Sequence, residues 1–247
     1  MARERTGNYG PFYGSLFDES EYLPQDQREV NARYIKTALW DYGWSESAIA
    51  AIIGNMDAES TLNPGSWQGN VVNATEYGYG LIQWTPAKRY ISWAEERDFD
   101  PSHIDCNLAR IFFELENNWS YDATEDYPLT YKEFIKSNQR PDYLAAAFVK
   151  NRLRPSDQSQ AVLDSRGFYA NHWYWFLFNK EPMDPPSINP NPNPGTGGGG
   201  GGGGGDDGGD DPWFPDWGGD PIKKKKKFNF LLFTAQRRRN KWIKKRY

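Results

Sequence analysis

The chain has 247 residues, and 38% of them are hydrophobic, a low fraction for a chain that is globular throughout. Its length allows one substantial domain with appendages. Cys106 is the only cysteine, which excludes an intrachain disulfide. The two histidines, His103 and His172, make a histidine-based metal site improbable, and we expect neither a metal nor a cofactor.

The net charge of −4 combines two parts of opposite sign. Residues 223–247 contain twelve Lys and Arg and no acid, and all 33 Asp and Glu residues precede them. The acidic part would repel phosphate, so we expect it to bind nucleic acid poorly. The basic part has the composition of a segment that contacts DNA or an anionic membrane surface.

The chain opens with residues 1–27, which we predict to be an irregular arm because glycine and proline recur in it. Its aromatic residues suggest that the arm packs on its own domain or on a partner protein. The apolar stripe of the next segment predicts a helix over about 27–42. Ser45 is a helix cap, and the helix after it should continue to Glu59, before Asn63-Pro64.

A loop over 62–76 and a short hairpin over 77–84 should follow. Thr85-Pro86 and Asp100-Pro101 each have the pattern of a helix start, and further helices are expected over about 130–138, from Pro141, and over about 157–177. The fold class is therefore mainly α, with one small β-hairpin.

The composition changes after Phe178. Residues 181–221 are rich in Pro, Gly and Asp, which predicts a tether with nothing to bury. Residues 222–247 are basic and aromatic, which predicts an anchor. The domain organisation is thus an arm (1–27), a folded domain (28–180), a linker and an anchor.

Glu59 is the candidate catalytic residue. A carboxyl at the end of a helix with one apolar face is half in the core, and partial burial raises its pKa because it disfavours the charged form. A raised pKa is what a general acid for glycoside cleavage needs. A lone Glu at a helix end is more often a solvated surface residue, so Glu59 by itself is a weak signal.

The stretch 77–85, Tyr-Gly-Tyr-Gly-Leu-Ile-Gln-Trp-Thr, strengthens that signal. Together with the other motifs, it resembles the phage tail lysozyme family of the lysozyme-like superfamily. The motifs that carry the resemblance occur in the family's order: Ala32-Arg33-Tyr34-Ile35, Gly54-Asn55-Met56, Glu59-Ser60, Tyr79-Gly80-Leu81-Ile82-Gln83-Trp84-Thr85 and Arg154-Pro155-Ser156. The resemblance covers about 28–178. One departure is Leu153, where the family often has Glu.

The resemblance implies a helical lysozyme-like domain that cuts peptidoglycan on the tail of a short-tailed phage, with Glu59 as the acid. A substrate-binding set would hold the N-acetyl sugars through amide and backbone groups and through aromatic faces. It comprises Ser60, Tyr79, Gly80, Leu81, Ile82, Gln83 and Trp84. The second carboxylate is open: Glu76 is a weak candidate, and Asp57 points to another helix face. Without one, the substrate's acetamido group could assist and give an anhydro product.

No signal peptide is recognisable, so such an enzyme would act from the virion or leave the cell through a holin-type pore. The expected partners are peptidoglycan and the tail knob or tube proteins, which the arm and the C-terminal segment would contact. Two alternatives remain: an endolysin-type lysis enzyme, and a structural tail protein with a lysozyme-like domain that does not cut.

Overall fold

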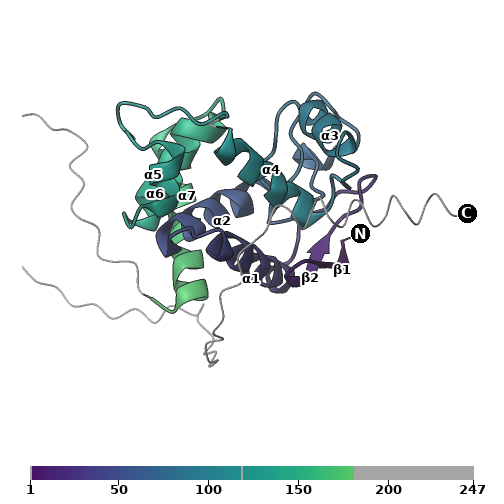
Figure 1. The fold of residues 1–247 in the computed structure, drawn as a ribbon, viewed down its shortest axis with the longest axis horizontal. Coiled ribbons are helices and arrows are strands. Elements are labelled where there is room, and N and C mark those ends of the chain that lie inside the picture. Colours follow the sequence, from purple (N-terminus) through teal and green to yellow (C-terminus); the bar gives the residue numbers. More distant parts are fainter. Residues whose placement is uncertain (1, 118, 181–247) are drawn as a thin grey trace, which may run out of the picture. The chain divides into compact units, whose positions relative to one another are not determined.

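The computed structural model describes residues 2–117 and 119–180, which form a mostly helical domain (Figure 1). The predicted fold class, mainly α with a small β component, is confirmed, but the two-stranded antiparallel sheet of the described residues lies at the N-terminus and not at 77–84. The helices are α1 (Gln25–Asp41), α2 (Glu46–Ser60), α3 (Ala87–Glu95), α4 (Ile104–Glu116), α5 (Tyr131–Lys136), α6 (Pro141–Phe148) and α7 (Gln160–Phe178). The linker and the anchor lie outside the described residues.

Helix α2 is the centre of the domain. It packs against α1, α6 and α7, and most of its residues are buried. Gly54 makes the contact with α7 possible, because a Cβ at this position would lie 2.5 Å from the backbone nitrogen of Ala170. The two helix backbones therefore touch at this crossing, which fixes how residues of α7 stand against the end of α2.

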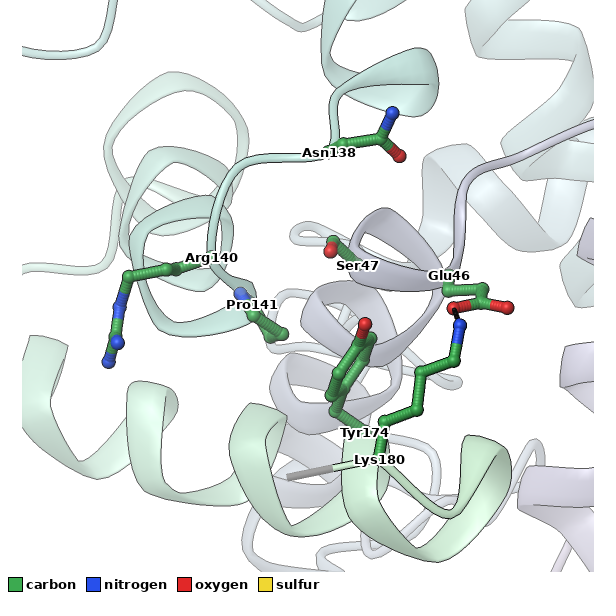
Figure 2. Close-up of a pocket in the computed structure, with 7 residues that line it drawn as sticks. All are labelled: Glu46, Ser47, Asn138, Arg140, Pro141, Tyr174 and Lys180. Carbon is green, nitrogen blue, oxygen red and sulfur yellow. Dashed lines mark hydrogen bonds and ion pairs between the residues drawn. The ribbon is translucent and has the colours of Figure 1, made fainter. Parts of the chain in front are cut away.

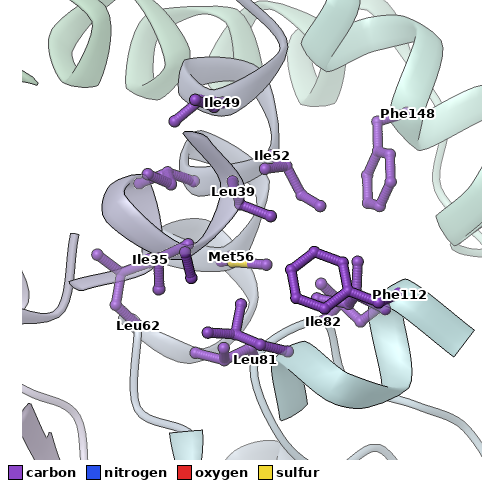
Figure 3. Packing of buried hydrophobic residues seen from close by; sticks show 14 of the residues in the cluster. Ile35, Leu39, Ile49, Ile52, Met56, Leu62, Leu81, Ile82, Phe112 and Phe148 are labelled. Carbon is purple, nitrogen blue, oxygen red and sulfur yellow. The ribbon is translucent and has the colours of Figure 1, made fainter. Parts of the chain in front are cut away.

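The core around α2 is shared by segments far apart in the sequence (Figure 3). Met56 of α2 lies beside Leu81 and Ile82, while Leu39 of α1 and Phe112 of α4 belong to the same buried cluster. Each Å² of apolar surface removed from water in such a core stabilises the folded state by about 25 cal/mol. The segment around residue 81 is thus a part of the core and not a surface loop.

The helix starts show which sequence signals determine the structure. Ser45 caps α2 as predicted, since its side chain accepts a hydrogen bond from the backbone N–H of Ala48. The short helix predicted over 130–138 is α5, and Thr130 and Glu133 form a complete capping box at its start. Pro141 occupies the first turn of α6, as expected.

The helix caps predicted at Thr85 and Asp100 are one and three residues early, respectively. The Thr85 hydroxyl donates to the carbonyl of Gln83 and caps no helix, so α3 begins at Ala87. Asp100 accepts from the backbone N–H of Ser102 and closes a turn of its own. His103 is the residue that caps α4. In both places a side chain bonds to a turn that precedes the helix.

The prediction of an irregular N-terminal arm was wrong for residues 3–14, while residues 15–24 form neither helix nor strand. Strands β1 (Arg3–Gly7) and β2 (Gly10–Gly14) form an antiparallel hairpin, and the turn uses Gly10 at φ +116°. The hairpin lies on its own domain, because Phe12 is fully buried and the Asn31 side chain of α1 bonds to both the N–H and the C=O of Tyr13. Within the described part of the chain, no helix is long and apolar enough to cross a membrane.

Candidate active site

Helix α2 ends one residue after Glu59. Thr61 and Leu62 take left-handed conformations, with φ of 51° and 59°, so the chain turns before the Asn63-Pro64 pair that we expected to stop the helix. The Glu59 side chain is 19% exposed and so keeps a narrow contact with solvent. Burial raises the pKa of Glu59 above its ordinary value, while the neighbouring Arg166 offsets a part of that rise.

Arg166 of α7 is the direct partner of Glu59. One guanidinium nitrogen lies 2.7 Å from Oε1 of Glu59, and the other donates to the backbone carbonyl of Asn55 at 3.1 Å. The Arg166 side chain is 12% exposed. This residue is not recognisable from the sequence, because 107 positions separate it from Glu59 and no local pattern marks it.

The short hairpin predicted over 77–84 is reduced to a tight turn, closed by backbone hydrogen bonds in both directions between Tyr79 and Trp84. Tyr79 forms single bridges with Trp84 and Trp67. Gly80 has φ +82°, and a Cβ on it would lie 2.6 Å from Oδ1 of Asn107. The same Asn107 oxygen accepts the N–H of Leu81 at 2.9 Å, so the turn is fixed to α4.

Ser60 connects this turn to the helix that carries Glu59. Its hydroxyl lies 2.9 Å from the carbonyl of Met56 and 3.1 Å from the carbonyl of Leu81, and it shares its proton between them. The Ser60 side chain is fully buried. It therefore sets the position of the turn relative to Glu59 instead of presenting a group to a ligand.

The predicted substrate-binding residues are mostly inside the protein. Of the eight residues predicted for the site, Glu59 and Gln83 keep partial exposure and the other six are buried. Tyr79 is fully buried. The ring of Trp84 is stacked on Tyr90 with centroids 4.5 Å apart. We therefore correct the prediction that Tyr79 and Trp84 offer ring faces to sugars: those faces already pack against other side chains.

The side chain of Gln83 forms hydrogen bonds within the turn. Its side-chain nitrogen donates to the carbonyls of Ser66 and Gly80 at 3.1 and 2.9 Å. Its backbone has φ +51°, a conformation that costs energy for a residue other than glycine. These contacts use both amide hydrogens, so the amide is a part of the turn's own structure.

A buried group of charges supports the turn from the side of α4. Glu114 accepts the indole N–H of Trp84 at 2.9 Å and forms ion pairs with Arg110 at 3.0 Å and Arg152 at 2.7 Å. The Glu114 and Arg110 side chains are almost fully buried. A buried carboxylate with three donors is well compensated, so this group fixes Trp84 in place.

The two candidates for a second carboxylate have other partners. Asp57 is 3% exposed and accepts from Arg28 at 3.3 Å and from the indole N–H of Trp173 at 3.1 Å; burial raises its pKa. Glu76 is 70% exposed and forms an ion pair with Lys88 at 2.7 Å. Asp57 is thus enclosed between α1 and α7, and Glu76 extends from the surface.

A pocket of about 260 Å³ lies at the opposite end of α2 (Figure 2). An ion pair between Glu46 and Lys180 lies along one side of it, and Ser47 of the first turn of α2 faces it. Thirteen residues at 1.5 Å each separate Glu46 from Glu59, about 20 Å along the helix. The pocket contains no residue of the predicted site, and among the described residues no three metal-ligating side chains are grouped to hold a metal ion.

The comparison with known families, and not the geometry of the site by itself, gives the class of this protein, a lysozyme-like domain. The sequence model of the phage tail lysozyme family matches residues 30–177, more than half of the chain, and the chain belongs to that family. It is also similar to Morphogenesis protein 1 of Bacillus phage B103, with 37% identity over 165 residues that cover 67% of this chain. The matched region is 44% of the length of that relative, so the chain corresponds to less than half of it.

Proposed function

We propose that this protein is a tail-associated glycosidase that cleaves the β-1,4 bonds of peptidoglycan glycan strands, with Glu59 as general acid. The observation that carries the proposal is the environment of Glu59. Its carboxyl is largely buried, its pKa is raised, and it still reaches solvent at the end of α2. A family match over residues 30–177 supports the same chemistry.

In the proposed reaction, protonated Glu59 donates its proton to the oxygen of the leaving sugar as the glycosidic bond breaks. Burial raises the pKa of Glu59, which is the direction that a general acid requires. The transition state resembles an oxocarbenium ion, and the acid becomes a carboxylate as the bond breaks. The turn at Gly80–Ile82 is buried and is held by Ser60 and Asn107, so we propose that it supports the end of α2 beside the N-acetyl sugars and does not bind them through the backbone groups of Gly80 and Leu81.

The second step has two chemical outcomes. An inverting hydrolase requires a carboxylate about 6.5–9.5 Å from the acid to activate water. Asp57 is enclosed by Arg28 and Trp173, and it does not suit that role. Glu76 is exposed but pairs with Lys88. If neither acts, the substrate's acetamido group would assist, and the product would be an anhydro-muramyl sugar.

The biological role that we propose is local opening of the cell wall so that the phage genome can enter. The similarity to a phage morphogenesis protein supports a place in the virion over release at the end of infection. Binding of tail knob or tube proteins by the N-terminal hairpin and by residues 222–247 remains a prediction, as does contact of the basic segment with DNA or an anionic membrane. Mass-spectrometric detection in purified virions would support the tail role, and absence from them would favour the endolysin-type role.

The test of the chemistry is a digest of purified peptidoglycan by the full chain and by Glu59→Gln, with the products analysed by mass spectrometry. We expect muropeptides from the wild type alone. Reducing ends would identify a hydrolase, and anhydro ends a lytic transglycosylase. Absence of product from both proteins would overturn the proposal and favour a structural tail component.

A further inference from the structure

Arg166 approaches Glu59 from α7, a helix whose backbone directly contacts that of α2. The Gly54–Ala170 crossing lies one turn of α7 beyond Arg166, so the guanidinium has little freedom to move away. Its two terminal nitrogens bind two different acceptors of α2, the Glu59 carboxylate and the Asn55 carbonyl. The arginine therefore spans the last turn of the helix that carries the acid.

Asn55, whose carbonyl accepts from Arg166, is itself held by further hydrogen bonds. Asn55 is fully buried, and its side-chain nitrogen donates to the carbonyls of Ala51 at 3.0 Å and Ala145 at 3.2 Å. The Ala145 contact joins α2 to α6, and Arg166 joins α2 to α7. The carbonyl that Arg166 uses as its second acceptor thus belongs to a residue fixed by three helices.

We propose that Arg166 is a positioning residue for Glu59: it holds the carboxyl in a single orientation at the end of α2 and stabilises the carboxylate that forms when the proton is donated. The proposal rests on the proposed function for its catalytic meaning. Its structural part, the fixing and charge stabilisation of Glu59, stands on the contacts of these two side chains.

The chemistry follows from where charge changes during the reaction. Before proton transfer Glu59 is neutral, and afterwards it is a carboxylate 2.7 Å from a guanidinium. The attraction between them is larger in the charged state, so Arg166 favours the transition state over the ground state. A hydrogen bond to a charged group contributes about 1.5–3 kcal/mol, equivalent to roughly 10-fold to 150-fold in rate.

Arginine suits this position better than lysine would. A planar guanidinium presents its N–H groups in a fixed fork and can serve the carbonyl and the carboxylate together, whereas an ammonium is a point charge on a flexible stem. Arg166→Lys should therefore keep much of the electrostatic effect and lose a part of the orientation. Arg166→Met should lose both while it retains an apolar stem of similar length.

The experiment compares Arg166→Met and Arg166→Lys with Arg33→Met in the full chain. Arg33 of α1 is the matched control, because its guanidinium contacts α7 at a different place, over the ring of Phe176 at 4.5 Å. The first readout is the pKa of the Glu59 carboxyl, followed by ¹³C NMR. The second is the pH dependence of kcat on soluble peptidoglycan fragments.

We expect Arg166→Met to raise the pKa of Glu59, to shift the alkaline limb of the rate profile to higher pH, and to lower the maximal rate about 10-fold to 100-fold. Arg166→Lys should fall between Arg166→Met and wild type, and Arg33→Met should match wild type in both readouts. A lower rate with no change in the Glu59 pKa or in the pH profile would overturn the proposal, since loss of structure alone gives that result.

Failure of this inference and failure of the proposed function are distinguishable. If the wild type cleaves no peptidoglycan, the proposed function fails, and the NMR titration still shows whether Arg166 controls the Glu59 carboxyl. If the wild type cleaves and Glu59→Gln does not, but Arg166→Met behaves as Arg33→Met does, the function stands and the role of Arg166 is refuted. Should Arg166→Met not fold, Arg166→Lys provides the same two readouts.

Discussion

Gly54→Ala tests how the domain holds its candidate site together. The new methyl carbon would lie 2.5 Å from the backbone nitrogen and 2.7 Å from the Cα of Ala170, where contacts of about 3.5–4.0 Å are normal. Both atoms are backbone atoms of α7, so no side-chain rotation removes the clash. The two helices must separate by about 1 Å, and Arg166 would move away from Glu59 with them.

The size of the effect follows from two opposing contributions. Alanine in a helix is about 1 kcal/mol more favourable than glycine, whereas forcing atoms into a packed core costs typically about 1–3 kcal/mol and occasionally more. Contact with backbone places this clash at the upper end of that range. We expect the free energy of unfolding to fall by about 1–2 kcal/mol, and the cleavage activity to fall as well.

The assay is urea unfolding of the full chain followed by tryptophan fluorescence, with Gly167→Ala as the comparison. A Cβ at Gly167 of α7 would meet the Cβ of the Asp142 side chain at 2.9 Å, and the nearest backbone atom is 3.5 Å away. Its loss of stability should therefore be the smaller of the two. A Gly54→Ala protein as stable as wild type would refute the close crossing of α2 and α7.

Three further substitutions test the site more locally. The pKa of Glu59 is raised in the folded state, so its favourable contribution to stability is full below the unfolded pKa and is lost as the pH rises through the folded pKa. Thermal unfolding should therefore show that Glu59→Gln gains stability relative to wild type at pH 7 but not at pH 4. An equal difference in stability at both pH values would contradict the raised pKa. Ser60→Ala removes the hydroxyl that joins α2 to the turn, so the free energy of unfolding should fall by about 1 kcal/mol and kcat should fall as well. An unchanged kcat would show that the turn does not need this hydrogen bond. Trp84→Phe removes one donor from the buried Glu114 carboxylate and should cost about 1–3 kcal/mol in chemical unfolding, whereas a neutral effect would mean that Arg110 and Arg152 suffice.

The sequence predicted the helices well where local signals decide the structure. Apolar periodicity together with the Ser45 cap defined α2, and the position of Glu59 in its last turn followed directly. The starts of α3 and α4 were misplaced because Thr85 and Asp100 bond to turns that precede those helices. The N-terminal hairpin was missed because its burial depends on Asn31 and on other parts of the domain that local composition does not reveal.

The site was harder to predict, because its chemistry depends on tertiary contacts. Tyr79 and Trp84 have the residue types of a sugar-binding platform, but the core occupies their faces, and sequence does not distinguish a buried ring from an exposed one. Ser60 was placed in the site, yet its contacts show that it supports the turn. Arg166 lies on a helix that meets Glu59 only in the folded domain.

The most direct test of the central claim is the initial rate of release of soluble muropeptides from purified sacculi by wild type, Glu59→Gln and Glu46→Gln. Glu46→Gln is the matched control, since it makes the same chemical change at the opposite end of α2, at a glutamate that pairs with Lys180. We predict that Glu59→Gln loses the activity, by at least about 100-fold, while Glu46→Gln retains it. A Glu59→Gln protein as active as wild type would contradict the account.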